Sequence, residues 1–155
     1  MEQLSEKKDV KNAKSVDGQS VKFVKLHLNA VCPYKKYKYD AGYDLTSIED
    51  VVLTDNAVTK IRTGIAVEIP EGYVGILKER SSLGSMGVKL YGGVIDATYR
   101  GEILVCLAHP YSFVINTGMR IAQMLIVPVL NVDFVEVEEL SESNRQTGGF
   151  GSTGI

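Results

Sequence analysis

The last eleven residues of the chain, 145–155, carry a set of groups suited to binding a nucleotide. An arginine can pair with phosphate, a phenylalanine can cover a base, and a glycine-rich backbone exposes N–H donors. So glycine-rich a segment cannot offset its own ordering entropy. The composition alone is also typical of a disordered tail. If the segment does act, we expect a ligand or a neighbouring subunit to order it.

A second candidate for phosphate binding is Arg80-Ser81-Ser82, which follows the apolar run VGILK. A guanidinium fork beside two hydroxyl groups at a strand end suits phosphate oxygens. The same residues are compatible with an ordinary salt bridge next to a serine-rich turn.

A third candidate combines the pair Gly92-Gly93 with Asp96. Paired glycines permit a tight hairpin whose backbone can approach a planar ligand. An aspartate at the end of the return strand could orient a water for attack, or it could cap backbone N–H groups in a turn. Asp44, in the segment AGYDLTS, says little alone.

The elements that must position these residues are predicted to be strands. Val, Ile, Thr, Tyr and Phe dominate short apolar runs separated by turn signals, and no sustained helical period is present. We therefore expect an all-β sandwich, jelly roll or small barrel with at most one short helix. The run 120–127 is ambiguous, but its β-branched content and Pro128 favour a strand. The runs are 21–28, 51–53, 61–69, 74–77, 88–95, 102–107, 112–115, 120–127 and 132–140.

The composition predicts one globular domain of moderate size. With 155 residues, 45% hydrophobic and 23% charged, the chain suits a single core and has no apolar run of membrane-spanning length. We expect a flexible N-terminal arm over 1–20, a β domain over 21–140 and a C-terminal arm over 141–155. The N-terminus lacks the apolar region of a secretory signal, which predicts a cytoplasmic or nuclear protein.

A net charge of -2 argues against a general polyanion binder. We therefore expect a local phosphate site and no stable binding to nucleic acid. We interpret the two cysteines and two histidines as structural residues, because their spacing fits neither a CxxC motif nor a metal site.

Five segments in this order resemble the five motifs of the trimeric dUTPases. They are AGYDLTS, ERSSLGS, GGVIDATYRGEI, RIAQMLIVP and RQTGGFGSTG, and the resemblance covers about residues 23–155. It implies a distorted jelly-roll (β-clip) barrel that forms a homotrimer with exchanged C-terminal arms. It also implies Mg²⁺-dependent hydrolysis of dUTP to dUMP and pyrophosphate, which limits uracil in DNA and supplies dUMP for dTTP synthesis.

The resemblance also implies residue roles. Asp96 matches the aspartate that holds the water attacking the α-phosphorus, and Tyr99 matches the tyrosine that stacks on deoxyribose and excludes a ribose hydroxyl. Gly93 lies in the hairpin whose backbone reads uracil. Asp44 matches the residue that reaches Mg²⁺ through water. Phosphate contacts from a second subunit match Arg80, Ser81, Ser82 and Gln123, and the closing arm of a third subunit matches Arg145, Phe150, Gly151 and Ser152.

Three positions depart from the usual motifs. Glu79 replaces a proline beside Arg80, and we expect its carboxylate to point away from the phosphate site or to pair with a cation. Thr98 stands where many members have Asp or Gly. Gln146 replaces a glycine after Arg145, which bears on how the arm closes. None of these changes removes a proposed chemical group.

Two other functions compete with dUTP hydrolysis. The related dCTP deaminases bind similar nucleotides, but the stretch after Asp96 lacks their signature, and ammonia rather than pyrophosphate would be the product. The alternating residues Tyr34-Lys35-Lys36-Tyr37-Lys38-Tyr39 could instead bind single-stranded nucleic acid through charge and stacking. They are more typical of a solvated loop with amphipathic side chains.

Overall fold

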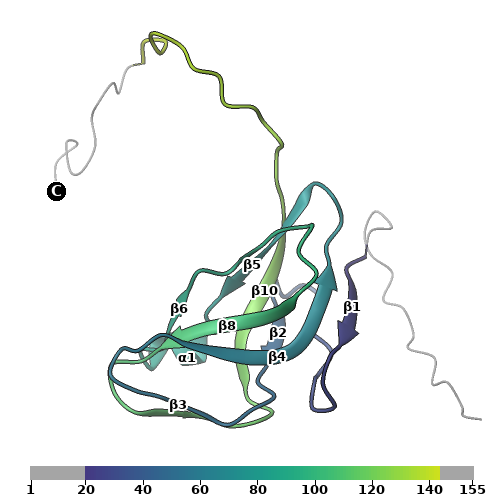
Figure 1. Cartoon of the computed structure of the whole chain (residues 1–155), viewed down its shortest axis with the longest axis vertical. Coiled ribbons are helices and arrows are strands. Elements are labelled where there is room, and N and C mark those ends of the chain that lie inside the picture. Colours follow the sequence, from purple (N-terminus) through teal and green to yellow (C-terminus); the bar gives the residue numbers. More distant parts are fainter. Residues whose placement is uncertain (1–19, 144–155) are drawn as a thin grey trace, which may run out of the picture.

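Short strands make up nearly all the regular structure of the protein, which we describe for residues 20–143 of a computed structural model (Figure 1). They form a four-stranded sheet of order β1-β4-β8-β6, a four-stranded sheet of order β2-β10-β5-β7 and the pair β3-β9. The elements are β1 (Lys22–Lys25), β2 (Tyr43–Thr46), β3 (Val51–Leu53), β4 (Thr59–Glu68), β5 (Tyr73–Lys78), α1 (Ser81–Ser85), β6 (Lys89–Tyr91), β7 (Val94–Ile95), β8 (Glu102–Ala108), β9 (Phe113–Ile115) and β10 (Arg120–Pro128).

One apolar core lies between the two larger sheets. In β8, the alternate residues Ile103, Val105 and Leu107 are buried, as the period of a half-buried strand requires. They belong to the same cluster as Leu77 of β5 and Ile121 of β10, which come from the other sheet. This packing of two mainly antiparallel sheets confirms the predicted all-β, distorted jelly-roll fold.

Most of the predicted runs are strands. The ambiguous run 120–127 lies within β10, which pairs with both β2 and β5 in the middle of its sheet. Pro128 ends this strand, opposite Tyr73. Within residues 20–143, α1 is the sole helix, as expected.

The prediction of a strand over 132–140 was wrong. Residues 129–143 lie outside the strands, and Figure 1 shows this segment leaving β10 and running away from the sheets. A strand needs a hydrogen-bonding neighbour, and within residues 20–143 no strand pairs with residues 132–140. Its apolar side chains are strongly exposed, Leu130 at 89% and Phe134 at 101%. Where the domain ends and the C-terminal arm begins remains a prediction, and the N-terminal arm lies outside the described residues apart from Ser20.

Glu79 links the two large sheets. Following β5, its Oε1 accepts the backbone N–H of Leu90 in β6 at 3.1 Å, and its Oε2 lies 3.7 Å from Nζ of Lys78. Backbone hydrogen bonds, from its own N–H and that of Leu90, hold the pKa of Glu79 below its usual value. The expectation that Glu79 pairs with a cation is confirmed.

Of the helices formed by residues 20–143, none has the length and apolar character needed to span a membrane.

We expect Glu79→Gln to destabilise the protein at pH 7 by about 1 kcal/mol, because a charged acceptor for the Leu90 N–H is lost. The folded pKa is lowered, so this contribution is complete above the unfolded value of about 4.3 and disappears as pH falls through the folded pKa. Urea unfolding at fixed protein concentration should show the difference at pH 7 and its progressive loss as the solution is acidified. The control is Glu71→Gln in the exposed β4–β5 turn, and a pH-independent difference for Glu79→Gln would contradict the linkage.

Candidate active site

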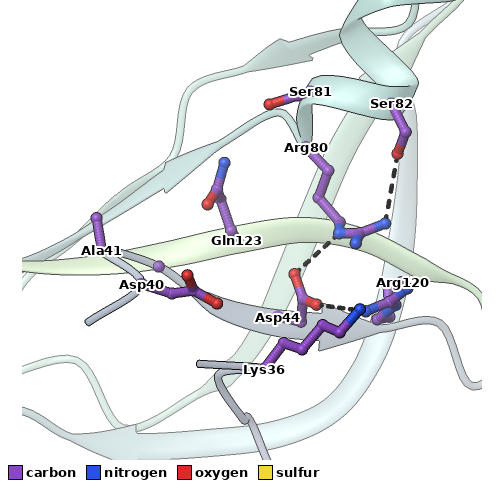
Figure 2. Close-up of a pocket in the computed structure, with 10 residues that line it drawn as sticks. Lys36, Asp40, Ala41, Asp44, Arg80, Ser81, Ser82, Arg120 and Gln123 are labelled. Carbon is purple, nitrogen blue, oxygen red and sulfur yellow. Dashed lines mark hydrogen bonds and ion pairs between the residues drawn. The ribbon is translucent and has the colours of Figure 1, made fainter. Parts of the chain in front are cut away.

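A polar pocket of about 360 Å³ lies where β2, β10 and the start of α1 meet (Figure 2). Charged and hydroxyl side chains dominate its lining, and none of the lining residues is aromatic. The lining residues are Lys36, Asp40, Ala41, Gly42, Asp44, Arg80, Ser81, Ser82, Arg120 and Gln123. Such a lining suits a compact polyanion better than an apolar ligand.

Asp44 holds two arginines in this pocket. Its Oδ1 accepts Nε–H of Arg80 at 2.8 Å, and its Oδ2 accepts Nη1–H of Arg120 at 3.0 Å. The Asp44 side chain is only 14% exposed, so water screens these pairs less than surface pairs. Tyr34 accepts a further bond from Arg120 at 3.3 Å, and Tyr34 and then Asp44 raise the pKa of Arg120 above its usual value. Two guanidinium groups are therefore oriented before any ligand arrives.

An irregularity in β10 brings Arg120 and Gln123 to the same pocket. Residues three apart in a regular strand face opposite sides of the sheet. The register with β2 shifts between Arg120 and Ala122, and Ile121 and Ala122 are both buried. This β-bulge reverses the alternation. Gln123 then donates from Nε2 to the backbone oxygen of Glu79 at 2.9 Å, beside Arg80.

The start of α1 supplies the hydroxyl groups. Ser81 and Ser82 are exposed, and Nη1 of Arg80 lies 3.5 Å from Oγ of Ser82. Figure 2 shows both serines on the side of Arg80 away from Lys36. Hydroxyl donors and guanidinium N–H groups thus face the same space, as binding several phosphate oxygens requires.

A second, smaller cavity of about 180 Å³ contains Asp96 and Tyr99. Asp96 directly follows β7 and is exposed, and its backbone oxygen accepts the N–H of Tyr99 at 3.0 Å in a tight turn. Tyr99 donates its hydroxyl hydrogen to the backbone oxygen of Glu102 at 3.0 Å, which fixes the ring. Gly101 lies against that ring, where any Cβ would collide with it. The remaining lining residues are Val94, Ile95, Glu102 and Leu104.

Gly93 occupies a position that excludes a side chain. Its φ is +99°, and a Cβ there would lie 3.0 Å from Cβ of Leu77 and 3.1 Å from Cδ2 of Leu90. The Gly93 oxygen accepts the N–H of Leu77 at 2.7 Å. The neighbouring Gly92 also has a positive φ, +69°, but open space around it. The two glycines thus form a tight turn whose backbone is anchored on β5, but the prediction of a hairpin was wrong, because β6 pairs with β8 and β7 pairs with β5 in the other sheet.

One chain does not bring the two cavities together. They share no lining residue, and β2 and β7 are opposite edges of one sheet, separated by β10 and β5. Three strand spacings amount to about 14 Å. The register adds about 10 Å along the strands, because Asp44 aligns through Gln123 with Lys78 while Ile95 aligns with Gly75. The structure thus brings together Arg80, Ser81, Ser82, Gln123 and Asp44, and separately Gly93, Asp96 and Tyr99.

Three charged pocket residues were not predicted from the sequence as site residues, namely Lys36, Asp40 and Arg120. Arg120 opens the motif RIAQMLIVP, but only the bulge makes it a neighbour of Asp44. Lys36 belongs to the run of alternating Lys and Tyr at residues 34–39, whose composition is also compatible with binding single-stranded nucleic acid. The predicted arm residues Arg145, Phe150, Gly151 and Ser152, and the departure at Gln146, lie outside the described residues.

Comparison with known proteins identifies the family of the chain. The dUTPase family model matches residues 29–154. The deoxyuridine 5'-triphosphate nucleotidohydrolase of Picosynechococcus sp. is 43% identical over 139 residues, which span 86% of this chain and 98% of that protein. The enzyme of the same name from Hydrogenobaculum sp. is 44% identical over 137 residues, 84% of this chain and 95% of that protein. The chain belongs to the dUTPase family.

Solved structures show the same similarity. A variant of the Staphylococcus bacteriophage 80alpha dUTPase with dUpNHpp superposes with a TM-score of 0.84 and 34% identity, covering 88% of this chain and 99% of that one. A variant of the dUTPase from phage phi11 of S. aureus, whose structure describes coordination of a structural Mg(II) ion, gives a TM-score of 0.74 and 31% identity. That match covers 78% of this chain and 98% of the other.

Replacing each glycine of the Gly92-Gly93 turn by alanine should separate backbone strain from packing. Gly92→Ala should cost about 1 kcal/mol, because only the positive φ opposes a Cβ in open space. Gly93→Ala adds contacts with Leu77 and Leu90, and should cost about 2–4 kcal/mol and weaken substrate binding. Urea unfolding and KM measured on both variants test this, and equal effects of the two changes would refute the close approach at Gly93.

Proposed function

We propose that this protein hydrolyses dUTP at active sites shared between copies of the chain, with Asp96 directing the attacking water. As a member of the dUTPase family, it is a hydrolase that converts dUTP to dUMP and pyrophosphate. The observation that carries the shared site is the separation of the Asp96 cavity from the Asp44 pocket on opposite edges of one sheet. A nucleotide cannot contact both in a single copy, but it can if two copies place unlike edges together.

The exposed segment 129–143 supports such an assembly. Its apolar side chains, including Val132 and Val135, are 66% and 76% exposed, which is unfavourable unless another surface covers them. Since the strands of its own sheets leave it uncovered, a neighbouring copy is the natural partner. We therefore propose a homotrimer in which this segment carries residues 144–155 toward a neighbour, with three sites at subunit interfaces.

Asp96 acts in this proposal by position rather than by strong basicity. A carboxylate accepts hydrogen bonds well but is a weak base, so Asp96 orients the water more than it activates it by taking its proton. The water oxygen attacks the α-phosphorus, and the bond from that phosphorus to the oxygen bridging to the β-phosphate breaks. Pyrophosphate leaves with that oxygen, and the proton of the water passes to Asp96 and then to solvent.

The cavity around Asp96 also suits the nucleoside. Tyr99, held by Glu102 and by contact with Gly101, offers a fixed ring face on which deoxyribose can pack and a 2'-hydroxyl would collide. The anchored backbone of Gly93 provides hydrogen-bonding groups for the uracil edge. The nucleoside and α-phosphate therefore belong to this cavity.

The other pocket suits the remaining phosphates. Arg80, Ser81, Ser82 and Gln123 contribute donors, and Arg120 adds a second guanidinium. A triphosphate carries nearly four negative charges, so this positive charge is needed to hold it in line for attack. We propose that a third copy closes the site with Arg145, Phe150, Gly151 and Ser152, as the resemblance implies.

The pocket also fits an Mg²⁺ ion bound mainly by substrate. Within residues 20–143, no three His, Cys, Asp or Glu side chains are grouped to hold a metal. Each Asp44 oxygen accepts one arginine N–H and keeps a lone pair for a metal-bound water. Mg²⁺ commonly binds through waters, phosphates and one or two carboxylates. The ion would neutralise phosphate charge, while Asp44 would orient its water shell.

Mixing two inactive variants tests the shared site. Asp96→Asn and Arg80→Gln should each reduce pyrophosphate release from dUTP by about 100-fold or more. If the two residues act in one site from different copies, random 1:1 refolding gives an intact pairing at about a quarter of the sites. About a quarter of wild-type activity should then return. The control mixture, Asp96→Asn with Asp96→Ala, should stay inactive, and no recovery in the first mixture would refute a shared site. Ammonia release would indicate a deaminase instead.

Removing residues 144–155 tests the closing arm. A chain that ends at Ser143 keeps every described contact of both cavities, so its assembly should match that of the full chain. Its kcat/KM for dUTP should fall about 100-fold, because the site can no longer exclude water. Light scattering measures the assembly, and pyrophosphate release measures the rate. Full activity in the truncated chain would contradict the proposed role of the arm.

A further inference from the structure

Lys36 lies in a loop that has no role in the function proposed above. The loop, residues 33–42, joins the chain before β2 to the edge of the Asp44 pocket and contains three lysines, Lys35, Lys36 and Lys38. We call it the lysine loop. Lys36 is the one of the three that lines the pocket, and Figure 2 shows its side chain directed toward Asp44 and Arg120.

The lysine loop is fastened at both ends of its turn. The backbone N–H of Asp44 donates to the oxygen of Tyr34 at 2.8 Å, which ties the loop to β2. Asp40 closes the turn: its Oδ2 accepts the N–H of Tyr37 at 2.9 Å, and its own N–H donates to the oxygen of Tyr37 at 3.1 Å. Lys36 is therefore presented from an ordered backbone, which lowers the entropy lost when its ammonium group binds a ligand.

Each of the three ammonium groups lies over a tyrosine ring. The distance to the ring centroid is 4.3 Å from Lys35 to Tyr43, 5.3 Å from Lys36 to Tyr37 and 5.4 Å from Lys38 to Tyr39. What distinguishes Lys36 is that it lines the pocket. Among the described residues, it has no carboxylate within ion-pair distance, so its charge is not neutralised there.

The charges of the pocket do not balance. Three cations, Lys36, Arg80 and Arg120, share it with the carboxylates of Asp40 and Asp44. Asp44 is occupied by both arginines, and Asp40 by the loop turn. A group of like charges in a partly enclosed space is unfavourable unless an anion joins it. The positive charge of Lys36, which no carboxylate of the pocket neutralises, therefore favours an anionic ligand here.

We propose that Lys36 is a substrate-binding residue that contacts the two phosphates released as pyrophosphate. This inference rests on the proposed function, which assigns the nucleoside and α-phosphate to the cavity of Asp96 and Tyr99. The Asp44 pocket is left with the β- and γ-phosphates, and Lys36 faces them from the side opposite Ser81 and Ser82. Lys36 thereby distinguishes triphosphate substrate from monophosphate product.

The test compares Lys36→Met with the matched variant Lys38→Met, which removes the same charge from the same loop outside the pocket. Lys36→Met should raise KM for dUTP and the inhibition constant of inorganic pyrophosphate by about 3- to 10-fold. The affinity for dUMP and kcat should stay within about twofold of wild type. Lys38→Met should leave all four values within about twofold, and Lys36→Arg should restore most of the affinity.

Three outcomes would overturn the inference. Equal effects of Lys36→Met and Lys38→Met would mean that the loop acts only through its general charge. Equal weakening of dUMP and pyrophosphate binding would place Lys36 at the wrong part of the nucleotide. An unchanged KM in Lys36→Met would remove it from the site, while failure of the wild-type protein to release pyrophosphate from dUTP would instead refute the proposed function.

Discussion

The order of strands in the sheet β2-β10-β5-β7 determines what a single copy of this chain can do. The sheet carries the Asp44 pocket at its β2 edge and the Asp96 cavity at its β7 edge, and the two strands β10 and β5 keep them apart. No side-chain rotation can close a gap fixed by backbone ladders. In the proposed mechanism, catalysis therefore depends on how copies of the sheet are placed against one another, and each copy contributes to more than one site.

Within the pocket at the β2 edge, Asp44 fixes the orientation of the arginine side chains. It holds Arg80 from the end of β5 and Arg120 from the start of β10, so one carboxylate sets the direction of two guanidinium groups from different strands. A site whose donors are already aimed loses less entropy and needs less reorganisation when its ligand binds. The bulge in β10 is part of the same arrangement, because it turns Arg120 and Gln123 to one side.

Much of this could be predicted from residue types and spacing. A short apolar run rich in β-branched and aliphatic residues predicted β8, and turn residues separated most of the strands correctly. The motif residues also fell into two coherent groups. The sequence could not predict that Arg120 lines the pocket, because the regular period of a strand places Arg120 and Gln123 on opposite faces of the sheet. Lys36 was missed because its side chain reaches the pocket only through the path of its loop. The segment 132–140 has a strand-like composition, but within residues 20–143 no strand lies beside it to form hydrogen bonds. Composition alone cannot reveal this.

The exposed segment 129–143 also bears on the aggregation of newly synthesised chains before the proposed assembly. A newly made copy carries Leu130, Phe134 and Leu140 in water, where they would adhere to other unfinished chains. Asp133, Glu136, Glu138 and Glu139 are interspersed among them. Their like charges make two free segments repel each other while leaving either able to dock on a complementary, finished surface. The acidic residues thus act as gatekeepers against aggregation during synthesis.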